Sequence, residues 1–370
     1  MTDIPLSLYV HFPWCIRKCP YCDFNSHALD GDLPEDAYID ALIADLMLEA
    51  GTEPRRNLES IFLGGGTPSL FSSNAISRLI TAIGEHFDVT RIEITIEANP
   101  GTFDQSRFEG YRRAGVNRIS IGAQSFNADQ LQKLGRIHQA ADIDAAVSGA
   151  RRAGFERINL DLMHSLPGQT TEEALADLDH AISLEPEHLS WYQLTIEPNT
   201  VFYSQPPTLP EEEITSSIME QGIDRLTGAG YRQYEVSAFA RPGEKAMHNL
   251  NYWLFGDYLG IGAGAHGKLT RHDRILRTTR TRMPGPYLQD PGRKEQAVAT
   301  NELTLEFLMN ALRLNEGFDP VLFTERTGLA IDLLDPFLEK AAGHGLLEVE
   351  SDRIQPTPRG HRFLNDLLLI

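Results

Sequence analysis

The stretch His11-Phe-Pro-Trp-Cys15-Ile-Arg-Lys-Cys19-Pro-Tyr-Cys22 holds all three cysteines of this 370-residue chain. An odd number of cysteines this close together cannot form a disulfide framework. With three and then two residues between successive cysteines, one loop can supply three thiolates to an iron–sulfur cubane and leave the fourth iron without a protein ligand. Such an open coordination site can bind a substrate or cofactor. We therefore expect Cys15, Cys19 and Cys22 to hold a [4Fe–4S] cluster.

A structural zinc ion is the main alternative for this loop. Zinc takes four ligands in structural sites, and His27 or His11 could supply the fourth. Such sites normally recruit a second, distant pair of ligands, and the chain has no other cysteine. The residue types favour the cluster, and a zinc-stabilised binding protein remains the alternative.

The composition restricts the classes of partner. The chain has 52 acidic and 33 basic residues, for a formal net charge of -19. Because such a surface repels phosphate backbones, we expect no nucleic-acid partner. No apolar stretch approaches the about 20 residues that span a membrane, and no basic region followed by an apolar run begins the chain. We expect a cytoplasmic protein without a transmembrane segment, which leaves peripheral membrane contact open.

Residues 1–240 alternate between short β-branched strands and amphipathic helices, which predicts an α/β fold with a parallel sheet wrapped by helices. The predicted strands are Leu6–His11, Ser60–Leu63, Ile92–Glu97, Arg118–Gly122, Arg157–Asp161 and Leu189–Leu194. About six βα units favour an open or partial (β/α) barrel, with its chemistry at the carboxyl ends of the strands. The cysteine loop directly follows the first of these strands.

The remainder of the chain predicts two further regions. Residues 241–300 are rich in aromatic residues, glycine and proline, and we expect them to be an irregular connection. Residues 301–370 predict three helices and a small hairpin, with a last helix over Pro358–Leu369, in a winged-helix-like domain. Winged-helix domains often bind DNA, but a fold alone does not assign function. The acidic character of this tail favours a structural or protein-docking role instead.

Several polar or glycine residues follow the predicted strands and would meet at one rim of the barrel. They are the run Gly64–Pro68, then Glu97, Gln124, Arg136 and Asp161. Together they would offer acceptors to hydroxyl and ammonium groups, and an arginine fork to a carboxylate. Taken singly, each is equally well explained as a tight turn, a helix cap or a solvated loop residue.

In combination with the cysteine loop, these residues resemble the radical S-adenosylmethionine (SAM) superfamily. The resemblance implies that the methionyl amine and carboxylate of SAM chelate the fourth iron. It also implies that Tyr21 lies against the adenine, and that Gly65, Gly66 and Thr67 belong to the glycine-rich motif beside the methionyl amine.

The order of the strand-end residues is similar to that of oxygen-independent coproporphyrinogen III oxidase and its relatives. The stretch Asp161-Leu-Met-His-Ser-Leu-Pro-Gly-Gln169 matches the same group. This resemblance implies that SAM is contacted by Tyr9, Glu97, Gln124, Arg136 and Asp161.

Two departures argue against coproporphyrinogen oxidation. The oxidases of this group carry a fourth cysteine two residues after the third, where this chain has Phe24, and a longer extension before the cluster loop. We expect no such oxidase activity, although that oxidase, or another radical SAM enzyme acting on a tetrapyrrole, remains the alternative function.

The stretch His248-Asn-Leu-Asn-Tyr252-Trp253 resembles the H-N-x-x-Y-W signature of the HemW family of haem chaperones, a sister family of the oxidases. A histidine can ligate haem iron, and aromatic rings can cover a porphyrin face. On residue types alone, a buried structural histidine is the more ordinary interpretation. The resemblance implies a chaperone in porphyrin metabolism that binds haem near His248, Tyr252 and Trp253 and transfers it to an acceptor haem protein. If His248 is structural, His11, His27 and His266 are the other candidates.

Overall fold

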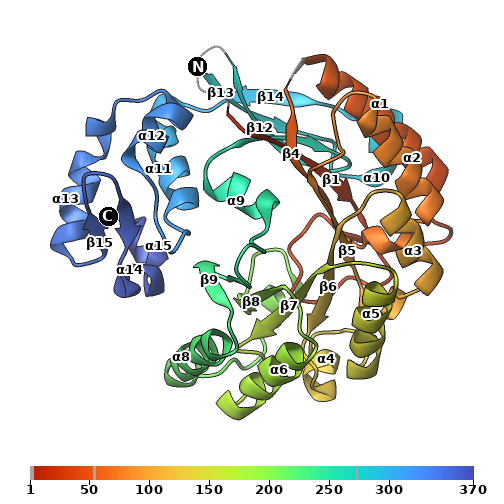
Figure 1. Ribbon diagram of the computed structural model, residues 1–370, viewed down its shortest axis with the longest axis horizontal. Helices are drawn as coiled ribbons and strands as arrows, with labels where there is room; N and C mark the ends of the chain where they lie inside the picture. The colour runs from red at the N-terminus through yellow and green to blue at the C-terminus, as the bar shows by residue number, and fades with distance from the viewer. Residues whose placement is uncertain (1–3, 53–55, 272–273) are drawn as a thin grey trace.

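The centre of the fold is one curved, open sheet, shown in the computed structural model of Figure 1. The structure describes residues 4–52, 56–271 and 274–370. Seven adjacent strands run parallel, in the spatial order β11 (Asp257–Ile261), β1 (Leu6–Phe12), β4 (Leu58–Gly65), β5 (Glu93–Ala98), β6 (Arg118–Gln124), β7 (Arg157–His164) and β8 (His188–Gln193). Antiparallel strands extend the two ends, namely β10 (Ala238–Ala240) and β9 (Arg232–Glu235) beyond β8, and β12 (His266–Arg271), β13 (Arg274–Thr279) and β14 (Lys294–Ala297) beyond β11.

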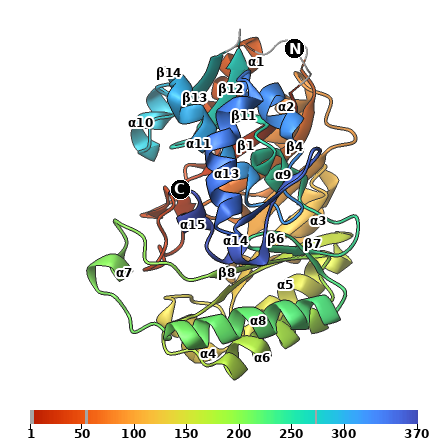
Figure 2. The same cartoon turned by 90° about the vertical axis from the view of Figure 1, so that its left-hand side faces the viewer.

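Helices that follow the parallel strands cover the outer face of this sheet (Figures 1 and 2). The long ones are α1 (Glu35–Thr52), α2 (Ser73–Gly84), α3 (Gln105–Arg113), α5 (Ala140–Arg152), α6 (Thr171–Ser183) and α8 (Glu212–Gly228). Shorter helices lie in the connections, namely η1 (Pro68–Leu70), η2 (Pro100–Thr102), α4 (Ala128–Lys133), α7 (Val201–Ser204), which projects on a loop in Figure 2, and α10 (Pro284–Gln289) after β13. The main core lies between the two layers, where strand residues such as Leu8, Ile61 and Ile96 are fully buried. Along strands such as β6 (R-I-S-I-G-A-Q) and β7 (R-I-N-L-D-L-M-H), apolar side chains alternate with polar ones, and the apolar set packs in this core.

All six predicted strands are present, and the partial (β/α) barrel is confirmed. The expectation for residues 241–300 was wrong, because this region contains α9 (Met247–Trp253), α10 and the strands β11 to β14. Its glycines concealed the strands, since glycine weakens the periodicity from which a strand is predicted. At Gly260 the strand requires glycine for a steric reason, because a Cβ atom would lie 1.9 Å from the carbonyl oxygen of His266 on the neighbouring strand.

The carboxyl-terminal residues pack around a second, smaller core, and the predicted winged-helix-like pattern of helices and hairpin is present. Its elements are α11 (Thr300–Ala311), α12 (Pro320–Thr327), η3 (Ile331–Leu334), α13 (Asp335–Gly343), β15 (Leu347–Val349), β16 (Ile354–Pro356), α14 (Pro358–Arg362) and α15 (Leu364–Leu367). The rings of Phe307, Phe318 and Phe323 meet edge to face at its centre. The continuous last helix that we expected is interrupted at Phe363, whose backbone (φ −114°, ψ 40°) leaves the helical range.

Helix α9 is the element that most affects the site. It lies inside the curve of the sheet, against β1 and β4 on one side and α11 on the other (Figure 1). The backbone N–H groups of Met247 and His248 donate to Glu93 Oε1, over 3.0 and 3.3 Å, and anchor its first turn to β5. The H-N-x-x-Y-W motif therefore occupies a fixed helix beside the sheet rather than an exposed connection.

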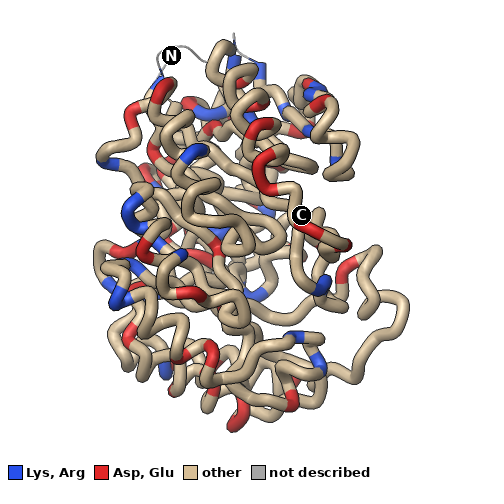
Figure 3. The backbone as a smooth tube through the Cα atoms, turned by 90° about the vertical axis from the view of Figure 1, so that its right-hand side faces the viewer, with Lys and Arg blue, Asp and Glu red and all other residues tan. Residues whose placement is uncertain are grey.

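Two observations bear on possible partners. In the part of the chain that the structure describes, no helix is long and apolar enough to cross a membrane. Acidic and basic residues are intermingled over the side of the molecule that Figure 3 displays, and the formal net charge is -19. This balance is unfavourable for binding phosphate backbones.

Candidate cluster and cofactor site

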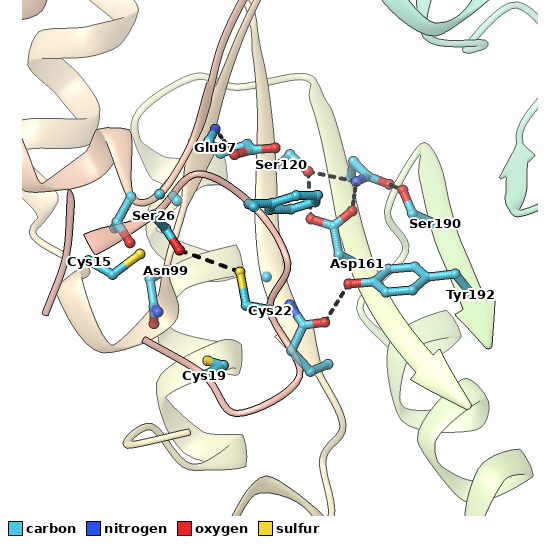
Figure 4. Close-up of a pocket in the computed structure, with 18 of the residues that line it drawn as sticks. Cys15, Cys19, Cys22, Ser26, Glu97, Asn99, Ser120, Asp161, Ser190 and Tyr192 are labelled. Atoms are coloured by element: carbon cyan, nitrogen blue, oxygen red, sulfur yellow. Dashed lines mark hydrogen bonds between the residues drawn. The ribbon is translucent and has the colours of Figure 1, made fainter. Parts of the chain in front are cut away.

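The three cysteines lie on a loop that leaves the end of β1 and is closed by two short paired strands, β2 (Trp14–Cys15) and β3 (His27–Ala28). All three side chains are partly exposed and line one cavity of about 520 Å³ at the carboxyl ends of the parallel strands (Figure 4). Burial raises the pKa of the Cys15 thiol. The Sγ atom of Cys22 lies 3.5 Å from the hydroxyl of Ser26.

This donor set fits a [4Fe–4S] cluster better than a single metal ion. Among residues 4–52, 56–271 and 274–370, no three His, Cys, Asp or Glu side chains converge closely enough to hold one ion. A cubane needs no such convergence, because each thiolate binds a different iron. Both ring nitrogens of His11 are already hydrogen-bonded, to the Tyr9 hydroxyl (2.8 Å) and the Asn25 carbonyl (2.9 Å). His11 is therefore not free to act as the fourth ligand of a zinc ion.

Side chains from the strand ends form the wall opposite the cysteine loop (Figure 4). Eight of the nine residues predicted to contact SAM line this cavity, namely Tyr21, Gly65, Gly66, Thr67, Glu97, Gln124, Arg136 and Asp161. They meet because the carboxyl ends of parallel strands share one edge of the sheet. The ninth residue, Tyr9, lines an adjoining second cavity.

Two carboxyl groups of this wall are half-buried. Oε2 of Glu97 accepts a hydrogen bond of 2.9 Å from the Gly65 N–H, and burial together with the nearby Asp161 raises the pKa of Glu97 to about 8. Asp161 accepts hydrogen bonds from Ser120 Oγ and Asn159 Nδ2, both over 2.8 Å, and burial also raises its pKa. Because a nearby positive charge favours the ionised form of a carboxyl group, this wall is suited to a cationic ligand.

The raised pKa of Glu97 predicts a specific pH dependence of stability. The folded state keeps the proton up to about pH 8, whereas the unfolded chain loses it near the ordinary value of 4.5. The free energy of unfolding should therefore fall as the pH rises through this window, by up to about 1.4 kcal/mol for each pH unit. Glu97→Gln mimics the neutral acid, so it should raise the melting temperature of the cofactor-free chain near pH 9 but hardly at pH 4. Equal melting temperatures of variant and parent at pH 9 would show that folding does not raise the pKa of Glu97.

Arg136 is the basic group beside the cluster loop. Its Nη2 donates to the Gly122 carbonyl over 2.7 Å, and its Nη1 lies 3.7 Å from Cys19 Sγ. Its Nε is buried and, within the described residues, has no hydrogen-bond partner. A buried donor without a partner marks a place where an acceptor is missing, and a ligand carboxylate is one such acceptor.

The glycine-rich motif has a steric explanation of its own. A Cβ atom at Gly65 would lie 2.5 Å from the His11 ring, and one at Gly66 would lie 2.5 Å from the Trp14 carbonyl oxygen. Gly65 also has a φ of +113°, which other residues rarely adopt. Close packing against the end of β1 therefore already requires glycine here, so the motif alone does not demonstrate ligand contact.

A polar network on β7 and β8, not predicted from the sequence, adds to this wall. Asn159 accepts from Ser190 Oγ over 3.2 Å and is hydrogen-bonded to His188 at 2.6 Å, while Tyr192 donates to Gln124 over 2.7 Å. All of these residues line the same cavity as Asp161. The sequence does contain a pattern that predicts this network. Polar side chains alternate with apolar ones along Asn159–Asp161 and His188–Tyr192, so the polar ones share one face of the sheet.

His248, one of the residues expected to bind haem, is enclosed in the fold. Its side chain is buried, with the residue 2% exposed, and both ring nitrogens have partners, Ser60 Oγ at 3.3 Å and the Tyr252 hydroxyl at 3.0 Å. The ring stacks on Phe62 at a centroid distance of 4.9 Å, and burial lowers its pKa to about 3. In this conformation His248 has no nitrogen free to ligate iron, because both nitrogens are engaged within the fold.

The two aromatic residues of the motif face different cavities. Trp253 and Asn249 line the cavity that holds the cysteines. Tyr252 lines the second cavity, of about 940 Å³, which adjoins the first at Phe24, Gly65 and Glu97. Helix α9 therefore separates and borders two neighbouring spaces.

Comparisons with known proteins agree with this geometry. The Radical SAM superfamily pattern matches residues 9–181, and the HemN C-terminal domain pattern matches residues 298–363. The proteins named heme chaperone HemW from Escherichia coli (strain K12) and Haemophilus influenzae are 52% and 50% identical to this chain, each over 98% of it and 97% of the relative. The structure of coproporphyrinogen III oxidase (HemN) from Escherichia coli superposes with a TM-score of 0.83 at 26% identity, covering 99% of this chain and 90% of the oxidase.

Identity of this extent over nearly the whole of both chains shows the family. The superfamily's cofactors are a [4Fe–4S] cluster and SAM, and the cavity offers three thiolates and a polar wall to receive them. The chain belongs to the HemW family of heme chaperones, within the radical SAM superfamily.

Proposed function

We propose that this chain is a haem chaperone, which binds haem and transfers it to an acceptor haem protein. The observation that carries the proposal is helix α9, whose Trp253 borders the cluster cavity and whose Tyr252 borders a second, open cavity. The volume of this second cavity, about 940 Å³, lies within the range of about 300–1,000 Å³ usual for ligand pockets. The names of the full-length relatives support the same function.

In this proposal Cys15, Cys19 and Cys22 hold the cluster, and the strand-end wall holds SAM. The unpartnered Nε of Arg136 is available to a carboxylate, while Glu97 and Asp161 are available to ammonium or hydroxyl groups. When bound there, the cluster would supply one-electron reduction chemistry to SAM. The residues of this chain position the cofactor and shield it, because the cavity walls are largely buried.

The role of Arg136 has a direct test. Arg136→Ala removes the charged donor, so SAM should bind about tenfold more weakly or worse, since a hydrogen bond to a charged group contributes about 1.5–3 kcal/mol. The iron content should not change, because the cluster's ligands are intact. Binding can be measured by equilibrium dialysis of the reconstituted protein, with Arg152→Ala, outside both cavities, as a control. Unchanged affinity in Arg136→Ala would remove Arg136 from the SAM site.

The second candidate function is oxygen-independent coproporphyrinogen III oxidation, which the fold of HemN favours. Phe24 stands where those oxidases have a fourth cysteine, and its side chain, with the residue 59% exposed, lines both cavities. We propose that this replacement is incompatible with the oxidation.

Haem transfer separates the two functions. The reconstituted chain should develop a Soret band on titration with haem and lose it when mixed with an apo-globin, whose own Soret band should appear. Incubated anaerobically with dithionite, SAM and coproporphyrinogen, it should form no protoporphyrinogen. Loss of substrate carboxyl groups in that assay would support the oxidase, and failure to bind or transfer haem would refute the chaperone.

We further propose a cytoplasmic location. Free thiolates are the form that binds iron, and a reducing compartment keeps them so. The acidic balance of the chain makes nucleic acid an unfavourable partner.

A further inference from the structure

The second cavity has the features of a tetrapyrrole site, and the following inference rests on the proposed function. Its lining combines aromatic rings, histidines and cations, and it opens beside the cluster cavity. Haem is a flat apolar ligand with an iron at its centre and two carboxylates at one edge, so a matching site needs an axial ligand, an apolar wall and paired cations. Each requirement can be examined separately in this cavity.

The candidate iron ligand is the histidine of this cavity that has a ring nitrogen free to bind iron. His11 and His266 are the histidines among the residues described as lining the cavity. Both ring nitrogens of His11 are engaged, by Tyr9 and Asn25, as are both ring nitrogens of the buried His248. His266, the first residue of β12, is exposed, and no hydrogen bond of its ring to another described residue is found. A neutral imidazole with a free nitrogen is the usual protein ligand of haem iron.

The apolar wall is provided by residues from three separate segments. The rings of Tyr252 and Tyr258 meet edge to face, with centroids 4.5 Å apart, and both line the cavity. Phe24, on the cysteine loop, is 59% exposed although it is a large apolar residue. A flat hydrophobic ligand that covered this ring would remove it from water, which is favourable.

Cations without ion-pair partners lie at the same cavity. Arg282 and Lys294 line it and are exposed, and no ion pair of either with another described residue is found. Neighbouring arginines are engaged, since Arg280 pairs with Asp45 and Glu49 in the core, and Arg277 pairs with Glu306. Lys294 of β14 lies opposite Thr279 at the end of β13, and Arg282 follows Thr279 in the loop that leaves β13. Carboxylates are the ligands that such cations recognise.

From these observations we propose that haem binds in the second cavity, with His266 as its axial ligand and with Arg282 and Lys294 pairing with its carboxylates. Tyr252 of the H-N-x-x-Y-W motif then covers part of the porphyrin, and His248 acts as a positioning residue through its hydrogen bond to the Tyr252 hydroxyl. In this arrangement the motif supports the haem site from behind, and the iron ligand comes from β12.

Three porphyrins test this assignment on the full-length reconstituted chain. His266→Ala should weaken haem binding by about tenfold or more and change the Soret band, with metal-free protoporphyrin binding as in the parent. The double variant Arg282→Ala, Lys294→Ala should weaken binding of haem by about tenfold and leave binding of haem dimethyl ester, whose carboxylates are blocked, unchanged. His86→Ala removes another exposed imidazole outside both cavities and should behave as the parent.

Each contrary result has a distinct meaning. Unchanged haem binding and spectrum in His266→Ala would overturn the proposed ligand while the parent's binding upheld the chaperone function. Equal weakening of haem and metal-free protoporphyrin would show that His266 packs against the ring rather than ligating iron, which also overturns the proposal. Loss of affinity for the dimethyl ester in the double variant would overturn the carboxylate pairing. If the parent itself bound no haem, the proposed function would fail before this assignment was reached.

Discussion

Replacing Cys15, Cys19 or Cys22 by alanine should abolish the iron–sulfur cluster. The three thiolates line one cavity, and a cubane held by only three protein ligands has none to spare. Anaerobic reconstitution of the parent should give about four irons per chain, with the sulfur-to-iron charge-transfer absorption of a cluster. Each variant should retain little iron and lose that absorption. Iron and sulfide analysis of the three variants, prepared in parallel with the parent, measures this effect.

Ser26→Ala is a matched control for these variants, because the Ser26 hydroxyl lies 3.5 Å from Cys22 Sγ on the same loop. It should keep about four irons per chain, since a hydroxyl is not among the ligands of the cubane. Full iron content in any one of the cysteine variants would exclude that residue as a ligand. Zinc without iron in the anaerobically purified parent would restore the zinc alternative that the geometry disfavours.

The partial barrel and most of the strand-end residues that line the cluster cavity could be predicted from the sequence. Alternating βα units determine a parallel sheet, and the carboxyl ends of parallel strands share one edge. Residues as distant in the chain as Gly65 and Asp161 could therefore be assigned to one site from the sequence alone. This inference needs only the position of each residue relative to its strand, which local patterns reveal.

The position of β11 could not be predicted in this way. It pairs with β1, although about 250 residues separate the two strands in sequence. That pairing places β12, β13 and β14 beyond β1 in the sheet and creates the second cavity beside the first. The family resemblance assigned Tyr9 to the SAM site, and only the placement of β11 and β12 shows that its side chain lines the second cavity.

The residues that surround His248 could not be predicted from the sequence either. The H-N-x-x-Y-W spacing places Tyr252 one helical turn after His248, so their side chains meet on one face of α9. Whether that face points to solvent or into the sheet depends on Ser60 and Phe62 of β4, which no local pattern connects to α9. A histidine in a motif is compatible with both roles, and packing decides between them.

This packing predicts that His248→Ala destabilises the fold strongly. The substitution removes a fully enclosed ring that stacks on Phe62 and leaves the Tyr252 hydroxyl without its partner at 3.0 Å. Deleting a buried aromatic side chain typically costs about 3–5 kcal/mol, and the smaller imidazole should cost about 3 kcal/mol. Denaturant unfolding of the variant and parent measures the difference. Tyr252→Phe, which removes only one hydroxyl, should cost about 1 kcal/mol and serves as the matched control.

Haem spectra of the same variants separate packing from ligation. Under conditions where His248→Ala is still folded, it should bind haem with the parent's Soret position, because the iron ligand is retained, although the affinity should fall as Tyr252 loses its support. A Soret band that changes in His248→Ala but not in His266→Ala would show that α9 opens to release His248 onto the iron. Since that opening would break two hydrogen bonds and a ring stack around His248, we expect the enclosed ring to remain structural and the iron to be ligated from β12.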